Sequence, residues 1–295
     1  MEMNEVLQDK LHKGVGTSKH ARKVVGDTAA DAIFSFNTYK AYKKHCAYFT
    51  TWARAKYKCK TLAQARQYAD EWLQMRIDAG LSAYTIKLEL AALCKLYGDT
   101  AADYIPTPPR LRKNITRSRG KVARDAHFSE AKNEAFCLFA RCTGLRRAEM
   151  KALTCEKLCH ADTLSQGDKL GQGEDYQWYI HVNKMSKGGR PRYAPIIGTP
   201  EEVDFVVNMM KRAGNGRVWD KVPQCDIHNF RSEYATAIYL KHCRPVKSLP
   251  KEERYCCRKD RKGTWFDRRA MGYASAALGH SFGRCSVVGE HYLRI

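Results

Sequence analysis

Apolar residues recur at helical spacing in three stretches of the first third of the chain. The first stretch begins near Asn37, a residue type that caps helices. The second follows Thr61 and stops at Gly80, and the third runs from Ser82 to Gly98; glycine often stands just past a helix end. Helices joined by such short turns predict a small helical bundle over residues 31–105.

The segments on either side of this bundle are basic. Residues 1–30 mix cations with small residues and lack a clear apolar stripe, so they are compatible with a basic arm or with a short first helix around residues 18–25. Residues 106–125 begin with a run of prolines and hold no acidic residue from Arg110 to Arg124. Proline blocks helix continuation and stiffens the chain, so this segment is predicted to be a basic linker between two domains.

The pattern changes beyond the linker, over residues 126–295. A helical stripe over residues 129–142 ends at Gly144, and a new helix begins at about Leu145. Further helices are predicted over residues 200–213 and 227–240, and in the last stretch, which carries His280 and Tyr292.

A β-hairpin is predicted between these helices. Apolar and polar residues alternate over residues 176–182, as in a strand, and a glycine-rich turn with Lys187 at its tip leads to a partner segment at 193–197. Residues 241–270 are basic and are expected to be irregular. The predicted fold is therefore mainly α with a small antiparallel β-sheet: a helical bundle followed by a second domain of helices and one hairpin.

Charge narrows the choice of partner. Lys and Arg total 52 against 31 for Asp and Glu, a net charge of +21 that is spread along the whole chain. A chain with 44% hydrophobic residues can build packed cores, so this excess is not that of a disordered tail. The balance predicts a polyanionic partner. A ribosome-like or membrane-surface basic protein is the alternative at this point.

The twelve cysteines are interpreted as reduced thiols, mostly buried, in a cytosolic protein, because neither a secretory leader nor a membrane span is apparent. Cys155, Cys159 and His160 could suggest zinc, as could Cys256-Cys257. Neither group has a second pair at zinc-finger spacing, so structural thiols are preferred and no metal is predicted.

Several residues together suit metal-free cleavage of a phosphodiester. That reaction needs a nucleophile, cations on the non-bridging oxygens and a proton donor for the departing oxygen. Arg146 follows a glycine at a predicted helix start, where backbone N–H groups favour an anion. Arg231 lies one helical turn after His228, so the two side chains share a face. Arginine matches phosphate geometry and keeps its charge, and histidine can shuttle a proton near neutral pH.

The remaining roles fall to side chains elsewhere in the second domain. Lys187, at the hairpin tip, can reach into a DNA groove and protonate the leaving 5′ oxygen. Glu149 shares a helix face with Arg146 and can orient a basic partner. Tyr292 is the candidate nucleophile. Each residue taken alone is more often an ordinary surface or core position, so the order and composition of the whole set carry the inference.

At these residues the second domain resembles the catalytic domain of the tyrosine recombinases, the phage-integrase family, over about residues 126–295. The resemblance rests on five boxes in order, which are Thr143-Gly144-Leu145-Arg146-Arg147-Ala148-Glu149-Met150, Ser186-Lys187-Gly188-Gly189-Arg190-Pro191-Arg192 (closed by Ala194-Pro195-Ile196), His228 to Arg231, Leu278-Gly279-His280-Ser281, and Tyr292. It implies catalytic roles for Arg146, Lys187, His228, Arg231, His280 and Tyr292, with Glu149 in support.

The resemblance also implies an architecture and a reaction. The bundle at 31–105 is similar to a core-binding domain that closes a C-shaped clamp on DNA. Tyr292 would form a 3′-phosphotyrosine, and strands would exchange through a Holliday junction in a homotetramer, with no metal, nucleotide or other cofactor. The wording of the boxes resembles integrases of conjugative or transposon-like mobile elements. A type IB topoisomerase, or a DNA-binding relative without activity, are the alternatives.

The expected partner is double-stranded DNA at recombination sites, with an accessory DNA-bending or directionality factor and no membrane. The expected location is the cytoplasm, on the nucleoid of a bacterial host. Residues expected to contact DNA are Lys40, Lys43, Lys44, Arg110, Arg112, Lys113, Arg190 and Arg192.

Overall fold

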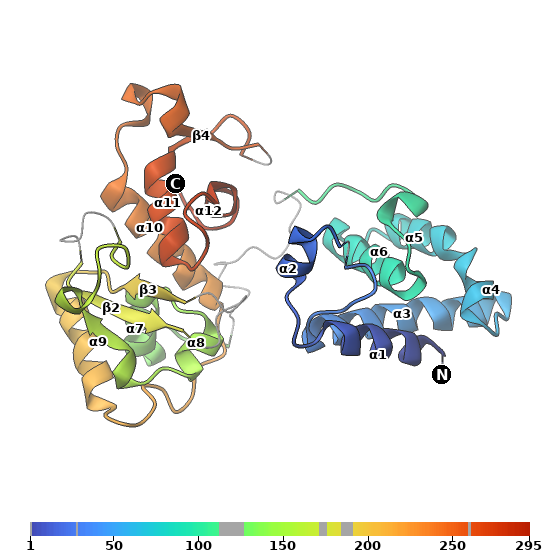
Figure 1. The fold of residues 1–295 in the computed structure, drawn as a ribbon, viewed down its shortest axis with the longest axis horizontal. Coiled ribbons are helices and arrows are strands. Elements are labelled where there is room, and N and C mark those ends of the chain that lie inside the picture. Colours follow the sequence, from blue (N-terminus) through green and yellow to red (C-terminus); the bar gives the residue numbers. More distant parts are fainter. Residues whose placement is uncertain (1, 28, 112–126, 171–175, 184–190, 259–260) are drawn as a thin grey trace. The chain divides into compact units, whose positions relative to one another are not determined.

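The structure is a computed structural model that describes residues 2–27, 29–111, 127–170, 176–183, 191–258 and 261–295 (Figure 1). The chain divides into two compact units, Met1–Ile115 and Thr116–Ile295, and each is described by itself. The division falls within the segment expected to be a linker, most of which lies outside the described residues. The described part is mainly helical, with two small antiparallel sheets.

The first unit is a helical bundle whose longest members are α3 (Phe36–Tyr57) and α6 (Ala83–Tyr97), which pack on each other. Helix α1 (Glu2–Gly14) packs against both and buries Leu7 and Leu11. The start of the chain is therefore an integral helix of the bundle and not a free arm. The short helices of the unit are α2 (Lys19–Val24), α4 (Leu62–Arg66), α5 (Ala69–Asp78) and the 3-10 turn η1 (Ala101–Asp103).

Capping residues explain where these helices begin. The hydroxyl of Ser35, not the side chain of Asn37, caps α3 by accepting a hydrogen bond from the Thr38 N–H at 3.2 Å. Helix α6 has the predicted ends, with Ser82 as its N-cap and Gly98 in the left-handed conformation after its last turn. The single helix expected from Thr61 to Gly80 is divided into α4 and α5. The interruption is at Gln67 and Tyr68, and Tyr68, with φ −97° and ψ 5°, departs from helical geometry.

The second unit begins with α7 (Glu134–Thr143) and α8 (Arg147–Lys151) and continues into a three-stranded antiparallel sheet. Its strands are β1 (Leu158–His160), β2 (Trp178–Val182) and β3 (Arg192–Pro195), in that order, with Ile180 opposite Ala194. The predicted hairpin is thus present, although residues 184–190, which include its tip, lie outside the described part. Strand β1 was not predicted, because three residues are too short to display an alternating pattern.

Further helices of the unit follow this sheet in the sequence. They are α9 (Pro200–Arg212), α10 (Ile227–His242), α11 (Arg268–Ala277) and α12 (Cys285–His291). Short 3-10 turns are η4 (Ala131–Asn133), η5 (Cys155–Lys157), η6 (Ala161–Thr163), η7 (Val246–Ser248) and η8 (Lys251–Glu253).

The segment at 241–270 is not irregular, contrary to expectation. Strands β4 (Arg254–Cys256) and β5 (Trp265–Asp267) form a second antiparallel sheet, with Tyr255 opposite Phe266. A buried carboxylate, Asp267, receives two hydrogen bonds from the Arg244 guanidinium, at 2.8 and 2.9 Å. This ion pair connects the start of the segment to its end. Each strand has only three residues, too few for the sequence pattern to reveal the pairing.

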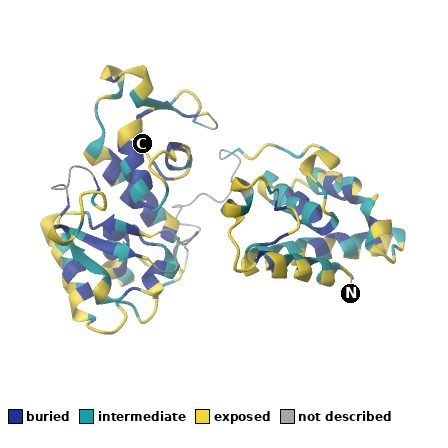
Figure 2. Cartoon of the chain, in the orientation of Figure 1, coloured by how far each residue is buried: buried dark blue, intermediate teal, exposed yellow. Residues whose placement is uncertain are grey.

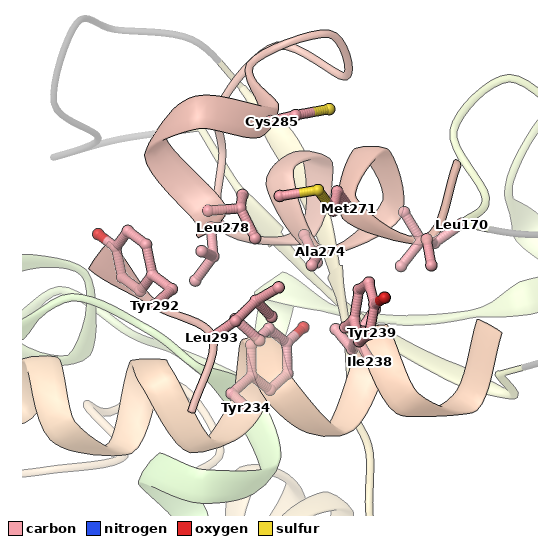
Figure 3. Close-up of a cluster of buried hydrophobic side chains, with 14 of the residues drawn as sticks. Leu170, Tyr234, Ile238, Tyr239, Met271, Ala274, Leu278, Cys285, Tyr292 and Leu293 are labelled. Atoms are coloured by element: carbon pink, nitrogen blue, oxygen red, sulfur yellow. The ribbon is translucent and has the colours of Figure 1, made fainter. Parts of the chain in front are cut away.

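Two hydrophobic clusters hold the second unit together. One lies between α7, α9 and the three-stranded sheet, and the other joins α10, α11 and α12. Figure 2 shows buried positions along the inward faces of these helices, and Figure 3 shows Tyr234, Met271, Ala274 and Leu278 in the second cluster. None of the cysteines, all of which lie in the described part, is in a disulfide; five are buried and the others partly buried. None of the described helices is both long and apolar enough to cross a membrane.

Candidate active site

Two arginine side chains of the second unit share one carboxylate. Glu149, on α8, accepts a hydrogen bond from Arg146 Nη1 at 2.7 Å. It also accepts from both terminal nitrogens of Arg192, on β3, at 3.0 and 2.8 Å. The main-chain N–H of Arg146 donates to Glu149 Oε2 at 2.7 Å. The main-chain N–H of Arg146 is therefore already hydrogen-bonded to Glu149 and is not available to an anion. The Arg146 guanidinium, which Glu149 orients, is the group that can bind one.

A third guanidinium, that of Arg231 on α10, lies against the same structure and is fully buried. Its Nη2 donates to the Leu278 carbonyl at 3.0 Å, and Arg146 Nη2 donates to the same carbonyl at 3.1 Å. Its Nη1 donates to the carbonyl of Gly144. Residues far apart in sequence thus bring two guanidiniums to one carbonyl oxygen.

Gly144 is required where α7 ends. It has a φ of +56°, and a Cβ there would lie 2.2 Å from the Tyr234 ring. The close approach brings the Gly144 carbonyl within reach of Arg231, which is on the same helix as Tyr234. The Thr143-Gly144 turn therefore allows the end of α7 to pack closely against α10.

The pKa shifts follow from burial and from charge. Burial opposes ionisation of Glu149, but the hydrogen bonds and charge of Arg192 and the Arg146 N–H lower its pKa to about 2. Burial, reinforced by the charge of Arg146, lowers the pKa of Arg231 to about 10, so Arg231 stays protonated at neutral pH. Three guanidiniums around one carboxylate leave the cluster with excess positive charge. A desolvated site of this kind favours an anionic ligand.

His280 and Tyr292 lie beside this cluster. The two ring centroids are 6.1 Å apart, and Arg231 Cζ lies 5.9 Å from the Tyr292 ring centroid. Burial, followed by the charges of Arg146 and Arg231, lowers the pKa of His280 to about 4, so the imidazole is neutral at pH 7. In Figure 3 the Tyr292 ring is at the edge of the hydrophobic cluster, and its hydroxyl points away from Leu293.

Two buried polar atoms at this point have no hydrogen-bond partner among the described residues: Arg231 Nε and His280 Nε2. Buried polar atoms in folded proteins are nearly always satisfied, so an unpaired donor next to excess positive charge indicates a ligand position. Both atoms belong to residues that surround Tyr292. The arrangement is suited to hold an anion beside a phenolic hydroxyl.

The structure brings together five of the residues predicted for the site: Arg146, Glu149, Arg231, His280 and Tyr292. His228 is exposed on α10, one helical turn before Arg231. Lys187 lies outside the described residues, so its predicted role stays a prediction.

Arg192 is not placed as predicted. It was expected to contact DNA, but its side chain is buried, paired with Glu149, and donates from Nε to the Ala277 carbonyl at 3.0 Å. Its guanidinium links β3 to α8 and α11. The signal was present in the sequence, since strand alternation places Arg192 on the same face as Ala194, which is fully buried.

Arg147 also has a structural role, which the sequence did not reveal: it connects α8 to the loop before α10. Its guanidinium donates to the carbonyls of Pro223 and Cys225, the latter at 2.7 Å. These bonds connect α8 to the loop that begins α10, and so align Arg146 with Arg231. No sequence signal distinguishes Arg147 from an ordinary surface arginine, because its partners are main-chain atoms.

The other predicted DNA contacts belong to the first unit or to undescribed segments. Lys40, Lys43 and Lys44 are exposed on α3, and Arg110 is exposed with its guanidinium 5.7 Å from the Tyr84 ring centroid. Arg112, Lys113 and Arg190 lie outside the described residues.

Hollows of the second unit are consistent with a site at His280. One, of about 430 Å³, is bordered by Gly279, His280 and Arg192. A larger one, of about 810 Å³, is lined from α9 and α10 and includes Glu202, Asp204 and Glu233. Arg141 and Lys241 also line the larger hollow, so its charge is mixed. Across the described residues, no three His, Cys, Asp or Glu side chains are grouped to hold a metal ion.

No protein-family model matches the chain, and no curated protein matches it significantly. Among solved structures, the chain is similar to a fragment of the Tn1549 transposon integrase in complex with transposon right-end DNA, with 12% identity, a TM-score of 0.47, and coverage of 100% of this chain and 96% of that one. The same integrase fragment with circular-intermediate DNA has 13% identity and a TM-score of 0.39, covering 85% and 95%. XerA recombinase has 14% identity and a TM-score of 0.30, covering 87% and 88%.

Proposed function

We propose that this protein is a tyrosine-type site-specific DNA recombinase that cleaves and rejoins DNA through a 3′-phosphotyrosine intermediate. One observation carries the proposal: the guanidiniums of Arg146 and Arg231 meet at the Leu278 carbonyl, directly beside Tyr292 and His280. Such a cluster suits a phosphate, because arginine pairs with its oxygens and remains charged in a desolvated site.

In the proposed reaction the Tyr292 oxygen attacks a DNA phosphorus, and the bond from phosphorus to the 5′ oxygen breaks. Arg146 and Arg231 hold the non-bridging oxygens, where charge develops in the transition state. His280, neutral at pH 7, offers a ring nitrogen to the same phosphate. Tyr292 gives its phenolic proton to the imidazole of His228, on α10, and the departing 5′ oxygen takes a proton from Lys187.

The phosphotyrosine bond conserves the energy of the phosphodiester. A 5′ hydroxyl from the same or another strand can therefore reverse the step, which releases Tyr292. Attack by a strand of another duplex would give a Holliday junction. We propose that this exchange takes place in a homotetramer on DNA and serves the integration or excision of a mobile element, with an accessory DNA-bending factor.

The DNA partner is supported by charge. The chain has a net charge of +21, and exposed cations gather on α3 at Lys40, Lys43 and Lys44. We propose that the first unit grips the DNA backbone with this face, that the two units together form a clamp, and that the protein works on the nucleoid of a bacterial cell.

The test is a covalent trap. A pool of randomised duplexes, each with a nick that lets a short cleaved strand diffuse away, is incubated with the protein and denatured in SDS. Protein-linked DNA is then recovered and sequenced. The proposal predicts linked DNA with a common sequence at the attached 3′ end, formed equally well in chelator. No linked DNA, or a strict need for Mg²⁺, would contradict it.

The recovered sequence then separates exchange from relaxation. Two duplexes that carry the sequence are predicted to yield recombinant products through a four-way junction. A protein that relaxes supercoiled plasmid containing the site but never exchanges partners would be a topoisomerase instead.

A further inference from the structure

Arg261, which lies between β4 and β5, contacts the segment that carries Tyr292. Arg261, just before β5, donates from Nη1 to the Gly289 carbonyl at 3.2 Å and to the Leu293 carbonyl at 3.1 Å. Its Nη2 donates to the main-chain oxygen of Ile295. One guanidinium thus binds carbonyls before and after Tyr292.

These carbonyls need a donor from elsewhere, because α12 ends here. The N–H groups of Tyr292 and Leu293 both donate to the Val288 carbonyl, at 2.9 and 3.1 Å. Because both N–H groups use the Val288 carbonyl, the Leu293 N–H does not bind the Gly289 carbonyl, which accepts from Arg261 instead. The last carbonyls of a helix carry partial negative charge and accept favourably from an arginine.

The hairpin holds Arg261 and α12 tightly. The Arg261 guanidinium lies over the buried Phe266 ring, with Cζ 4.9 Å from the ring centroid. A Cβ added to Gly289 would lie 2.9 Å from Met271 Cε and 3.2 Å from Cys257 Sγ, so α12 packs closely against α11 and against the residue that follows β4. The chain beyond Tyr292 is held from another side too, because the Arg294 N–H donates to Thr236 Oγ1 on α10 at 3.1 Å.

We propose that Arg261 is a positioning residue for the nucleophile, and that the β4–β5 hairpin acts as a clasp that fixes the Tyr292 segment against the arginines. The proposal rests on the assignment of Tyr292 as nucleophile. Arg261 does not touch the DNA phosphate; it acts through the main chain of residues 289–295. The clasp explains why a charged hairpin is inserted between α10 and α11, a segment for which the sequence suggested no role.

The experiment compares Arg261→Ala with Arg261→Lys and with Lys262→Ala in the full chain. Lys262 is exposed next to Arg261, so its substitution removes the same charge without a main-chain contact. Lysine at 261 keeps the charge but lacks the planar fork that spans separate carbonyls. Three quantities are measured: amide hydrogen exchange, DNA affinity, and the single-turnover rate of covalent adduct formation at saturating DNA with the trapped sequence.

We expect Arg261→Ala to speed exchange of the Tyr292 and Leu293 amides while the amides of α11 stay protected. Adduct formation should slow roughly 10- to 100-fold, because a misplacement of about 1 Å can cost on the order of 10²-fold in rate. DNA affinity should change less than about twofold, since Arg261 is assigned to carbonyls and not to phosphates. Arg261→Lys should be intermediate, and Lys262→Ala should resemble the unaltered protein.

Each other outcome has a definite meaning. Unchanged exchange at Tyr292 and Leu293 would overturn the clasp. Faster exchange with an unaltered adduct rate would overturn the positioning role, and loss of DNA affinity equal to the loss of rate would make Arg261 a DNA contact. Failure of the unaltered protein to form any adduct would contradict the proposed function instead, while the exchange data would still decide whether the clasp exists.

Discussion

The protein places its positive charge in two opposite environments. On α3 of the first unit, Lys40, Lys43 and Lys44 are exposed, and Lys40 and Lys44 lie over the rings of Phe36 and Tyr48. In the second unit, Arg231 is fully buried and Arg192 nearly so, each held by named carbonyls or by Glu149. Salt screens the exposed cations, and one exposed lysine or arginine can replace another. The buried guanidiniums are held in one orientation by their hydrogen bonds.

This difference separates affinity from chemistry. Cations on an open face attract any stretch of phosphates and gain through counterion release. Guanidiniums that converge from α8 and α10 on one carbonyl can hold only one phosphate, in one orientation. We therefore expect substitutions on α3 to change how strongly DNA binds, and substitutions in the cluster to change what happens to it. Four predictions test whether affinity and chemistry are separate in this way, in decreasing order of effect.

The largest effect is expected from Tyr292→Phe. The ring can keep its packing against the hydrophobic cluster, but the attacking oxygen is gone, so adduct formation should be abolished while DNA affinity stays within about twofold. Denaturing gels of trapped complexes and binding titrations measure the two quantities. An adduct on the variant protein would show that another residue is the nucleophile.

Arg146→Ala should come next. It removes one of the two cations proposed to stabilise the transition state, so the adduct rate should fall by roughly 10²–10³-fold with a much smaller loss of affinity. Lys151→Ala, exposed at the end of the same short helix, is the matched control and should leave the rate intact. Equal losses of rate and affinity for Arg146→Ala would reduce it to an anchor.

Glu149→Gln tests the buried ion pairs through stability. Removing a buried partner leaves Arg192 and Arg146 uncompensated, and the free energy of unfolding should fall by about 3 kcal/mol. Because the folded-state pKa of Glu149 is about 2 and its ordinary value is 4.5, its contribution is complete above pH 4.5 and is lost as the pH falls toward 2. Urea unfolding at several pH values measures this.

The control for that measurement is Glu252→Gln, an exposed carboxylate in η8. It should change stability by less than about 0.5 kcal/mol. If Glu149→Gln were as mild as Glu252→Gln, the two guanidiniums would not depend on the carboxylate, and the rigid geometry assigned to the cluster would be wrong.

The smallest effect is expected from replacing Lys40, Lys43 and Lys44 together by alanine. The logarithmic dependence of DNA affinity on salt should become shallower by up to about 3, roughly 1 for each lost phosphate contact, while the adduct rate at saturating DNA stays the same. The matched variant with three arginines should restore the slope. An unaltered slope would mean that this face of α3 does not meet DNA.

Much of the fold could be predicted from local chemistry. Helix α6 was anticipated at both ends because Ser82 and Gly98 are strong, local signals. Helix α1 was missed because its stabilisation comes from packing Leu7 and Leu11 on α3 and α6, which no local pattern reveals. The β4–β5 pairing was hidden because each strand has only three residues, too few to display an alternating pattern.

The candidate site divides in a similar way. Arg146, Arg231 and Tyr292 could be selected because their chemistry suits a phosphate, and His280 through its box in the family resemblance; the structure brings these residues together. The supporting parts could not be selected, because they work through the main chain: Arg147 binds carbonyls before α10, and Arg261 binds carbonyls around Tyr292. Residues that act on main-chain atoms leave no signature in side-chain type.

The most direct test is an experimental structure of the Tyr292→Phe protein with the DNA sequence recovered by trapping. We predict one backbone phosphate whose non-bridging oxygens accept hydrogen bonds from Arg146 and from Arg231 Nε, with His280 Nε2 in reach and the ring at position 292 facing the phosphorus. A complex in which the DNA contacts only exposed lysines, and the arginine cluster faces no phosphate, would contradict it.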